Sequence, residues 1–169
     1  MPPALVPLKQ ADGQVDGQVD AQHDPLHIAV LDTHIWLEWL LWRSPRLDPL
    51  RIKHAAGHLQ ILHSMETLAE WRRVLGYPQF AQSPEQIEAL CLEYIELSLC
   101  CELMADVERR KLPQCRDSDD QKFLELSVMG SAAWLITRDK KLRKIGKHKA
   151  FKSLGLQVNT LEFYMATLC

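Results

Sequence analysis

The sequence contains no uninterrupted apolar run of about 18 residues, so we expect no transmembrane helix and no membrane partner. Its first residues, MPPALVPLKQ, lack the charged start and the long apolar stretch of a secretory signal peptide. The five cysteines include no Cys-x-x-Cys pair, which does not favour a disulfide framework or a cysteine-ligated zinc site. These absences together predict a reduced, cytoplasmic protein.

An excess of positive charge is also missing. The formal net charge is −2, so the molecule as a whole does not attract nucleic acid, and any basic binding surface must be local. The chain has 169 residues and is 47% hydrophobic, as expected for one globular domain. Residues 1–26 contain four prolines and the tandem DGQVDGQV, and they bury too little apolar surface to offset the entropy of ordering. We therefore expect a disordered tail over 1–26 and a single domain over 27–169.

Short apolar runs alternate with helical patterns along this domain. The expected strands are 28–31, 59–64, 101–107, 132–137 and 156–158. The expected helices are 33–42 (apolar almost all round and capped by Thr33), 48–57, 65–75, a long helix after the N-cap Ser83, 123–130, 140–146 and 160–168. This alternation predicts an α/β fold, a three-layer α/β/α sandwich with a mainly parallel central sheet.

Several acidic residues stand where sites form in such sheets. Asp32 ends the first strand and Asp139 follows the strand at 132–137, so both lie at the carboxyl ends of strands. Each could instead cap the next helix. Glu70 lies four residues after Glu66, a pairing that mildly destabilises a helix, so one of the two could point into a shared site. The other interpretation is two solvated glutamates.

The stretch RDSDDQKF, residues 116–123, places Asp117, Asp119 and Asp120 within four positions ahead of an apolar run. Capping of the next helix and metal binding are both open for it. If acids from separate segments converge, their repulsion raises their pKa values, and a hard divalent cation relieves the conflict. Carboxylate oxygens suit Mg²⁺ or Mn²⁺, and such a metal can activate water against a phosphodiester bond.

A basic segment surrounds Asp139. Between Arg138 and Lys152, eight of fifteen residues are Lys or Arg. This segment is either a solvated helix face or a local patch that holds a polyanion beside the acids. The candidate RNA-binding residues are Arg138, Lys140, Lys141, Arg143 and Lys144.

Four sequence blocks resemble the PIN-domain ribonucleases, in particular the branch that contains toxin components of bacterial toxin–antitoxin systems. The blocks are VLDTHIWLEWLL, SMETLAEWRRVLGYPQF, CRDSDDQKFLELSVMGSAAWLITRDKKL and NTLEFYMATL. The third block is the most specific, and the resemblance covers about residues 28–168. It implies an α/β/α nuclease domain in which four acids hold Mg²⁺ or Mn²⁺ and cleave single-stranded RNA, leaving a 5′-phosphate and a 3′-hydroxyl.

Carried over by position, the resemblance identifies catalytic, metal-binding acids and supporting residues. The acids are Asp32, Glu70, Asp120 and Asp139, and the supporting residues are Asp117, Asp119, Thr33 and Thr137. Asp117 or Asp119 could share or replace the role of Asp120. Many family members have asparagine where this chain has His34, for which we expect a core or rim position.

The same resemblance implies an RNA substrate, a cognate antitoxin protein and a possible homodimer. The five tryptophans are expected in the core, although Trp39 or Trp42 could lie at a dimer face. Two other classes stay open: a catalytically silent nucleic-acid- or partner-binding module of the same fold, and a Mg²⁺-dependent phosphoryl-transfer α/β domain. A phosphatase of the latter class needs a second aspartate where the chain has His34.

Overall fold

The computed structural model describes residues 25–102 and 111–167. Its strands are β1 (His27–Leu31), β2 (Leu59–His63), β3 (Leu99–Cys100), β4 (Trp134–Ile136) and β5 (Gln157–Asn159). Its α-helices are α1 (Thr33–Trp36), α2 (Asp48–Ala55), α3 (Met65–Leu75), α4 (Pro84–Glu96), α6 (Gln121–Met129), α7 (Lys140–Ile145), α8 (Lys149–Ser153) and α9 (Leu161–Ala166). A π-helix η1 (Leu37–Leu41) and the 3₁₀ helices η2 (Pro45–Leu47), η3 (Pro78–Phe80) and η4 (Ser118–Asp120) complete them. Within the described ranges, no helix has the length and apolar character that a bilayer span requires.

The five strands form one sheet in the order β3-β2-β1-β4-β5, and every pair of neighbours is parallel. β1 lies in the centre, where Val30 pairs with Leu62 of β2 on one side and with Leu135 of β4 on the other. Because the strands are parallel, their carboxyl ends meet at one edge of the sheet. The loops that carry Asp32 and Asp139 are thereby brought together.

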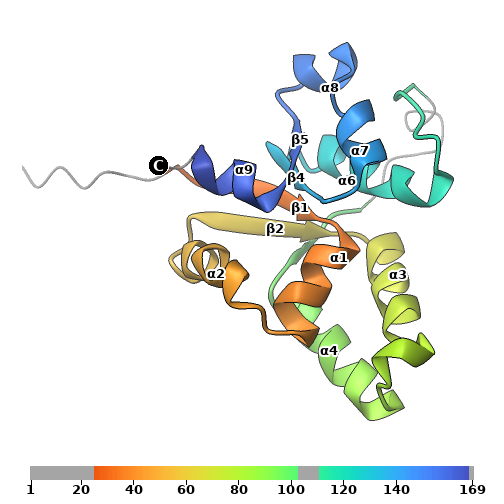
Figure 1. Cartoon of the computed structure of the whole chain (residues 1–169). Coiled ribbons are helices and arrows are strands. Elements are labelled where there is room, and N and C mark those ends of the chain that lie inside the picture. The colour runs from red at the N-terminus through yellow and green to blue at the C-terminus, as the bar shows by residue number, and fades with distance from the viewer. Residues whose placement is uncertain (1–24, 103–110, 168–169) are drawn as a thin grey trace, which may run out of the picture.

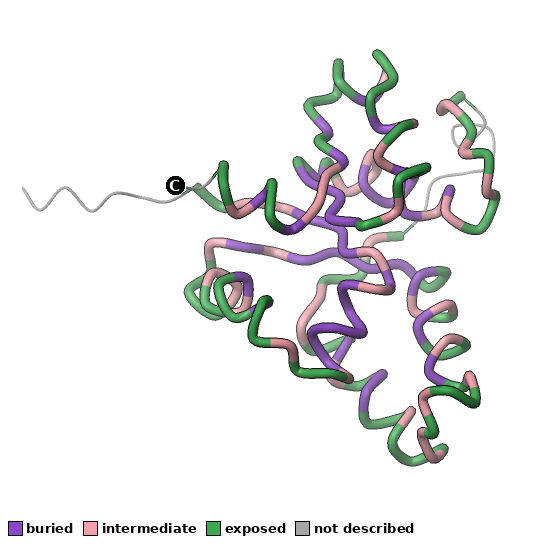
Figure 2. The backbone as a smooth tube through the Cα atoms, viewed as in Figure 1, coloured by how far each residue is buried: buried purple, intermediate pink, exposed green. Residues whose placement is uncertain are grey.

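Helices cover both faces of the sheet (Figure 1). Helices α1 to α4 and α9 pack on one face, and α6, α7 and α8 pack on the other. The strands β1, β2 and β4 are largely buried, whereas β3 at the edge of the sheet is exposed and most helices expose their outer sides (Figure 2). The predicted three-layer α/β/α sandwich around a parallel sheet is confirmed.

The alternation of side chains along β1 divides the core in two. Ala29 and Leu31 point into the apolar cluster under α1, α2, α3 and α4, while Val30 points into the cluster under α6. All three residues are at most 1% exposed. A strand that is buried on both faces must be apolar there, which explains the run AVL at the end of β1. Burial of a side chain the size of Val30 or Leu31 contributes roughly 1.5–3 kcal/mol.

Some local expectations were wrong. Thr33 is the first residue of α1 and not its cap, because the N-cap is Asp32. The expected helix 33–42 changes into the π-helix η1 after Trp36, and Glu38 in η1 is only 4% exposed. Helix α8 was not expected from the sequence.

The expected strand 101–107 also differs. The strand in this region, β3, comprises Leu99–Cys100, and Cys101 and Glu102 are not in a strand. Residues 103–107 lie outside the described residues, as does almost all of the expected tail 1–26. The domain boundary at residue 27 stays a prediction.

Candidate acidic site at the carboxyl edge of the sheet

Asp32 follows β1 directly and does not cap α1 through its side chain. Its Oδ2 instead accepts a hydrogen bond of 2.6 Å from Oγ1 of Thr137, at the end of β4. Burial raises the pKa of Asp32, an effect that the Thr137 hydrogen bond reduces and the nearby Glu70 carboxylate increases. The capping alternative therefore does not account for Asp32.

Thr137 connects this aspartate to the next. The backbone N–H of Asp139 donates to Oγ1 of Thr137 at 2.9 Å, and the threonine itself is fully buried. Oδ1 of Asp139 accepts from the backbone N–H groups of Lys141 and Leu142, at 2.5 and 2.9 Å. Asp139 thus caps α7 with one oxygen, and within the described part of the chain its Oδ2 makes no hydrogen bond. One carboxylate oxygen is left for another role.

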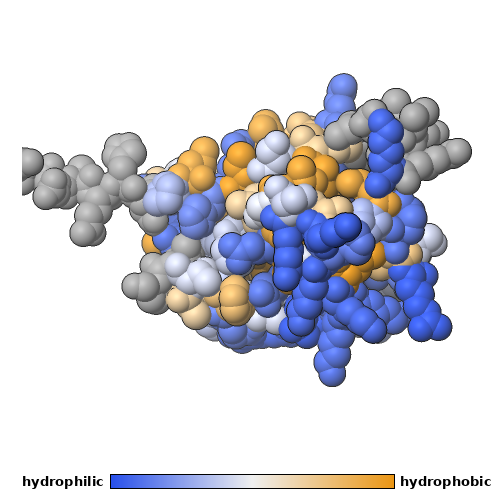
Figure 3. Space-filling view, turned by 90° about the horizontal axis from the view of Figure 1, so that it is seen from above, coloured by the Kyte–Doolittle hydropathy of each residue, from blue (hydrophilic) through white to orange (hydrophobic). Residues whose placement is uncertain are grey.

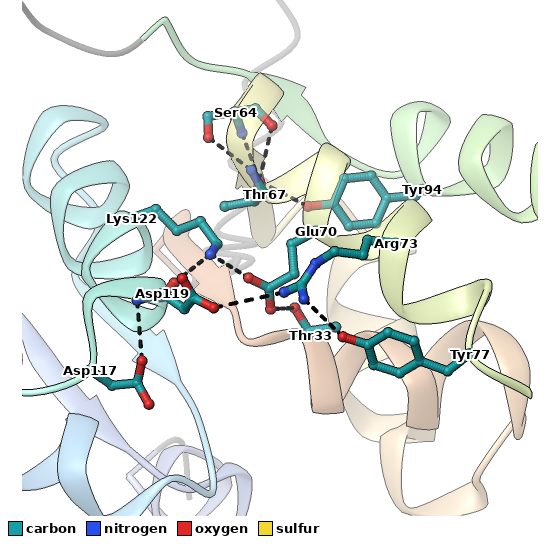
Figure 4. Close-up of polar contacts among 10 residues, drawn as sticks. All are labelled: Thr33, Ser64, Thr67, Glu70, Arg73, Tyr77, Tyr94, Asp117, Asp119 and Lys122. Carbon is teal, nitrogen blue, oxygen red and sulfur yellow. Dashed lines mark hydrogen bonds and ion pairs between the residues drawn. The ribbon is translucent and has the colours of Figure 1, made fainter. Parts of the chain in front are cut away.

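Glu70 turns toward the acids from α3, whereas Glu66 one turn earlier is exposed. Oε1 of Glu70 accepts a hydrogen bond of 2.7 Å from Oγ1 of Thr33, and Oε2 forms an ion pair with Nζ of Lys122 (Figure 4). The side chains of Glu70 and Lys122 are each only 14% exposed. The ion pair is therefore shielded from solvent, and both carboxylate oxygens of Glu70 are engaged.

The three aspartates of RDSDDQKF have different surroundings. Asp117 is the N-cap of η4, where its Oδ1 accepts from the backbone N–H of Asp119 at 3.2 Å. The side chain of Asp119 is 75% exposed, and its Oδ2 lies 4.0 Å from the Arg73 guanidinium (Figure 4). Asp120 precedes α6 and does not cap it. Capping and solvation thus account for two of the three residues and leave Asp120.

Asp120 is where the acidic residues interact most strongly. Its pKa is raised to about 6, first by partial burial and then by repulsion from Asp117, Asp139, Asp32 and Glu70. Acids from three other segments, together with Asp117 of its own segment, therefore act on one carboxyl group, as the sequence suggested for a converging site.

The donor set fits a hard divalent cation in its chemistry, because it consists of carboxylate oxygens whose mutual repulsion such an ion would relieve. Among the described residues, no three His, Cys, Asp or Glu side chains converge closely enough to hold a metal as they stand. Two of the acids are engaged within the protein, because Asp32 accepts a hydrogen bond from Thr137 and Glu70 pairs with Lys122. Side-chain movements would have to accompany metal binding.

Lys122 belongs to this network and was not predicted from the sequence. Its Nζ also donates to the backbone oxygen of Asp119. A signal for it existed, because Lys122 is the second residue of α6, where the helix dipole disfavours a cation. A lysine in the first turn of a helix is therefore expected to pair with a neighbouring acid.

The basic residues gather beside the acids on the α7 and α8 side. Lys140, Arg143 and Lys144 line a hollow of about 360 Å³ together with Lys147 and Lys152. Nε of Arg143 is buried and has no hydrogen-bond partner within the described residues. The face over α6, α7 and α8 carries many hydrophilic side chains (Figure 3). Of the remaining expected RNA-binding residues, Lys141 points its Nζ to within 3.9 Å of Asp117, and Arg138 turns the other way, toward Glu38.

A larger hollow of about 900 Å³ lies between α3 and α6. It meets the acidic site at Glu70 and Lys122, and its wall also includes Arg73, Asp119 and Glu125. Asp32, Asp120 and Asp139 do not line it. The acidic site therefore meets this hollow at one side and does not form its floor.

The family model of the PIN domain matches residues 29–141, which is more than half of the 169-residue chain. The chain belongs to the PIN-domain family. The matched range begins in β1 and includes all four acids of the site. PIN domains are generally nucleases, which supports a hydrolase. No curated protein matches the sequence significantly.

Among solved structures, the fold is similar to a chain in the crystal structure of VapBC2 from Rickettsia felis bound to a DNA fragment from their promoter. The TM-score is 0.54 at 16% sequence identity, and the match covers 78% of this PIN domain chain and 98% of that chain. At this identity the similarity establishes the fold.

Proposed function

We propose that this PIN domain protein is a metal-dependent endoribonuclease that cleaves single-stranded RNA. The observation that carries the proposal is the convergence of Asp32, Glu70, Asp120 and Asp139 at the carboxyl edge of the sheet, where Thr137 binds Asp32 and Thr33 binds Glu70. The pKa of Asp120, raised by burial and then by these neighbouring carboxylates, agrees with this convergence. Carboxylates that repel one another at the carboxyl edge of a sheet destabilise the fold. A divalent cation bound among them would remove this repulsion. Membership of the PIN-domain family also supports a nuclease.

Asp32, Glu70, Asp120 and Asp139 would hold Mg²⁺ or Mn²⁺. The ion would lower the pKa of water and stabilise negative charge on the phosphate oxygens. Thr137 fixes the orientation of Asp32, and the hydrogen bond from Thr33 does the same for Glu70. The cations of α7 would hold the RNA backbone beside these acids.

A nuclease assay on a single-stranded RNA, with Mg²⁺, with Mn²⁺ and with a chelator, tests the activity. Asp32→Asn and Asp120→Asn should each abolish cleavage, and the products of the wild-type protein should carry a 5′-phosphate and a 3′-hydroxyl. Two matched controls lie in the same segments: Glu66→Gln on α3 and Asp119→Asn, both at exposed acids, should retain activity. Cleavage by both active-site variants at the wild-type rate would refute the proposal. RNA binding by a wild-type protein that never cleaves would favour a silent binding module.

We further propose that the protein is the toxin of a toxin–antitoxin pair and acts in the cytoplasm. Its fold is similar to that of a chain from a VapBC2 complex, which supports an antitoxin partner. Expression in a bacterial host should arrest growth, and co-expression of a small protein from the neighbouring gene should restore it. Growth arrest by Asp120→Asn as strong as that by the wild type would contradict a role based on RNA cleavage.

A further inference from the structure

A hollow of about 530 Å³ lies next to the acidic site, on the side of α1 and η1. His34, Glu38, Trp42, Arg46 and Arg138 line it. It adjoins the acids through the chain itself, because His34 is two residues after Asp32 and Arg138 directly precedes Asp139. Its volume is within the range of roughly 300–1,000 Å³ that is typical of small-ligand sites.

A buried carboxylate organises the cations of this hollow. The side chain of Glu38 is 6% exposed; its Oε1 lies 2.7 Å from Nη1 of Arg138, and its Oε2 lies 3.2 Å from Nη1 of Arg46. Nε2 of His34 lies 3.3 Å from the same carboxylate. A buried ion pair contributes little net stability compared with apolar packing, so fixing the guanidinium groups is the better explanation for Glu38.

Arg138 keeps donors for a ligand. Its Nη1 contacts Glu38 and His34, at 2.7 and 3.1 Å, while within the described residues its Nη2 and Nε make no hydrogen bond. The side chain is 40% exposed. Arg46 is more fully engaged, because its Nη2 also pairs with Glu162. The guanidinium of Arg138 is therefore held in place and still accessible, as recognition of a phosphate requires.

An exposed aromatic ring forms the other wall. Trp42 is 49% exposed, whereas the remaining four tryptophans are at most 5% exposed. Its ring meets the His34 ring edge-on at 5.5 Å between centroids and lies 6.3 Å from the Phe80 ring. Of the two tryptophans for which a surface position was left open, Trp42 is exposed and Trp39 is buried.

The backbone around Trp42 is fixed. The π-helix η1 ends there with a hydrogen bond of 2.9 Å from the Trp42 N–H to the Leu37 oxygen, and the Ser44 N–H donates to the Glu38 oxygen at 2.8 Å. Both Nη groups of Arg43 bind the carboxylate of Glu93, at 2.6 and 2.7 Å. π-Helices are rare in proteins, and those that occur are frequently found at functional sites. Here the π-helix η1 presents an indole ring to solvent in a defined position.

We propose that this hollow binds one nucleotide of single-stranded RNA, with the base stacked on Trp42 and a phosphate oxygen bound by Arg138. The inference rests on the proposed function and locates the substrate relative to the acids. An aromatic face beside a fixed guanidinium is the combination that binds single-stranded nucleic acid, because every base can stack and every linkage carries a phosphate. Glu38 is a positioning residue in this arrangement.

Photo-cross-linking tests the position of the base. A short single-stranded RNA with 5-iodouridine at successive positions is bound to the Asp120→Asn variant without metal and irradiated, and cross-linked peptides are identified by mass spectrometry. Cross-links at Trp42 or His34 are expected. In parallel, Trp42→Ala should weaken binding of the same RNA about five-fold or more, since base stacking on an aromatic ring is lost, whereas Trp42→Phe should retain most of it. Phe163→Ala, at an aromatic residue that is 45% exposed on α9, is the matched control and should leave binding unchanged.

The outcomes separate the inference from the proposed function. If the wild type cleaves RNA, but Trp42→Ala binds RNA as tightly as the wild type and the cross-links lie elsewhere, the nucleotide site is refuted and the nuclease stands. The hollow would then be free for a protein partner. If cross-links form at Trp42 and Trp42→Ala binds more weakly, but no cleavage occurs, the nuclease is refuted and the site stands. A protein that neither binds nor cleaves single-stranded RNA refutes both.

Discussion

The hydroxyl of Thr137 donates a hydrogen bond of 2.6 Å to Asp32, joining the carboxyl ends of the neighbouring strands β4 and β1. The same hydroxyl oxygen accepts the backbone N–H of Asp139 at 2.9 Å. One buried threonine thus orients two acids: Asp32, which lies 105 positions before it in the sequence, and Asp139, which lies 2 positions after it. It ties the site geometry to the register of the central sheet.

Replacing Thr137 should therefore affect stability and activity together. Thr137→Val keeps the shape but leaves a buried carboxylate and a backbone N–H without their partner, which should lower the free energy of unfolding by about 1–3 kcal/mol. We expect RNA cleavage to fall more than the stability loss explains, because Asp32 loses its orientation. Urea unfolding and initial cleavage rates measure the two effects. Thr137→Ser retains the hydroxyl and should behave nearly as the wild type; equal defects in both variants would show that the methyl group matters instead.

The raised pKa of Asp120 predicts a pH dependence of stability. The folded protein binds the Asp120 proton more tightly than the unfolded chain, whose pKa is about 3.8, because the folded value is about 6. Between these values the folded state holds more protons, so its stability falls as the pH rises from about 4 to about 6. Burial also raises the pKa of Asp32, which contributes with the same sign.

Asp120→Asn removes this contribution. The difference in free energy of unfolding, wild type minus Asp120→Asn, should decrease as the pH rises from about 4 to about 6 and stay constant above that. Urea midpoints for both proteins across the pH range measure the difference. A difference that is constant with pH, or that grows in favour of the wild type, would contradict the assignment of the raised pKa to Asp120.

Lys122 compensates the charge of Glu70 and should compete with a metal ion for this region. Lys122→Met removes the cation from a shielded pair, so the variant should lose about 1–3 kcal/mol of stability without metal. Mg²⁺ should then stabilise it more than it stabilises the wild type, because the unpaired acids gain a new partner. Thermal unfolding with and without Mg²⁺ measures both effects. Lys140→Met, at an exposed lysine of α7, serves as the control, and a smaller Mg²⁺ effect in Lys122→Met than in the wild type would refute the competition.

Local sequence chemistry determined much of the fold. The helix predicted over 65–75 has these bounds in the structure, because Ser64 and Thr67 form a capping box at its start and Gly76 follows its end. Ser83 and Pro84 likewise fix the start of α4. The apolar run that ends in Asp32 identified the central strand, since only a strand buried on both faces is apolar throughout.

The unpredicted features depend on contacts between distant segments. Glu38 of the π-helix η1 pairs with Arg138, which lies a hundred positions further along the chain. The pairing of Glu70 with Lys122 likewise joins α3 to α6. The sequence identified Asp120 as one of three crowded aspartates, but their different surroundings were determined by tertiary structure.

The basic hollow by α7 and α8 predicts a salt dependence of RNA binding. Each cation that neutralises a phosphate releases counterions, so log affinity falls with log salt concentration. Removing one such cation should make this negative slope less steep by about 0.7 for a single strand. We expect this change for Lys144→Gln and for Lys147→Gln, which both line the hollow. Fluorescence anisotropy of a labelled RNA on the inactive Asp120→Asn background, over a series of salt concentrations, measures the slope.

Arg72→Gln is the matched control for this series. Arg72 lies on the exposed side of α3 in an ion pair with Glu88, away from the hollow, so its replacement removes the same charge from the chain. The control should leave the slope unchanged. If all three variants make the slope less steep by the same amount, the effect comes from net charge and the hollow is not a contact surface. If the two lysine variants leave it unchanged, the RNA follows another path past the acids.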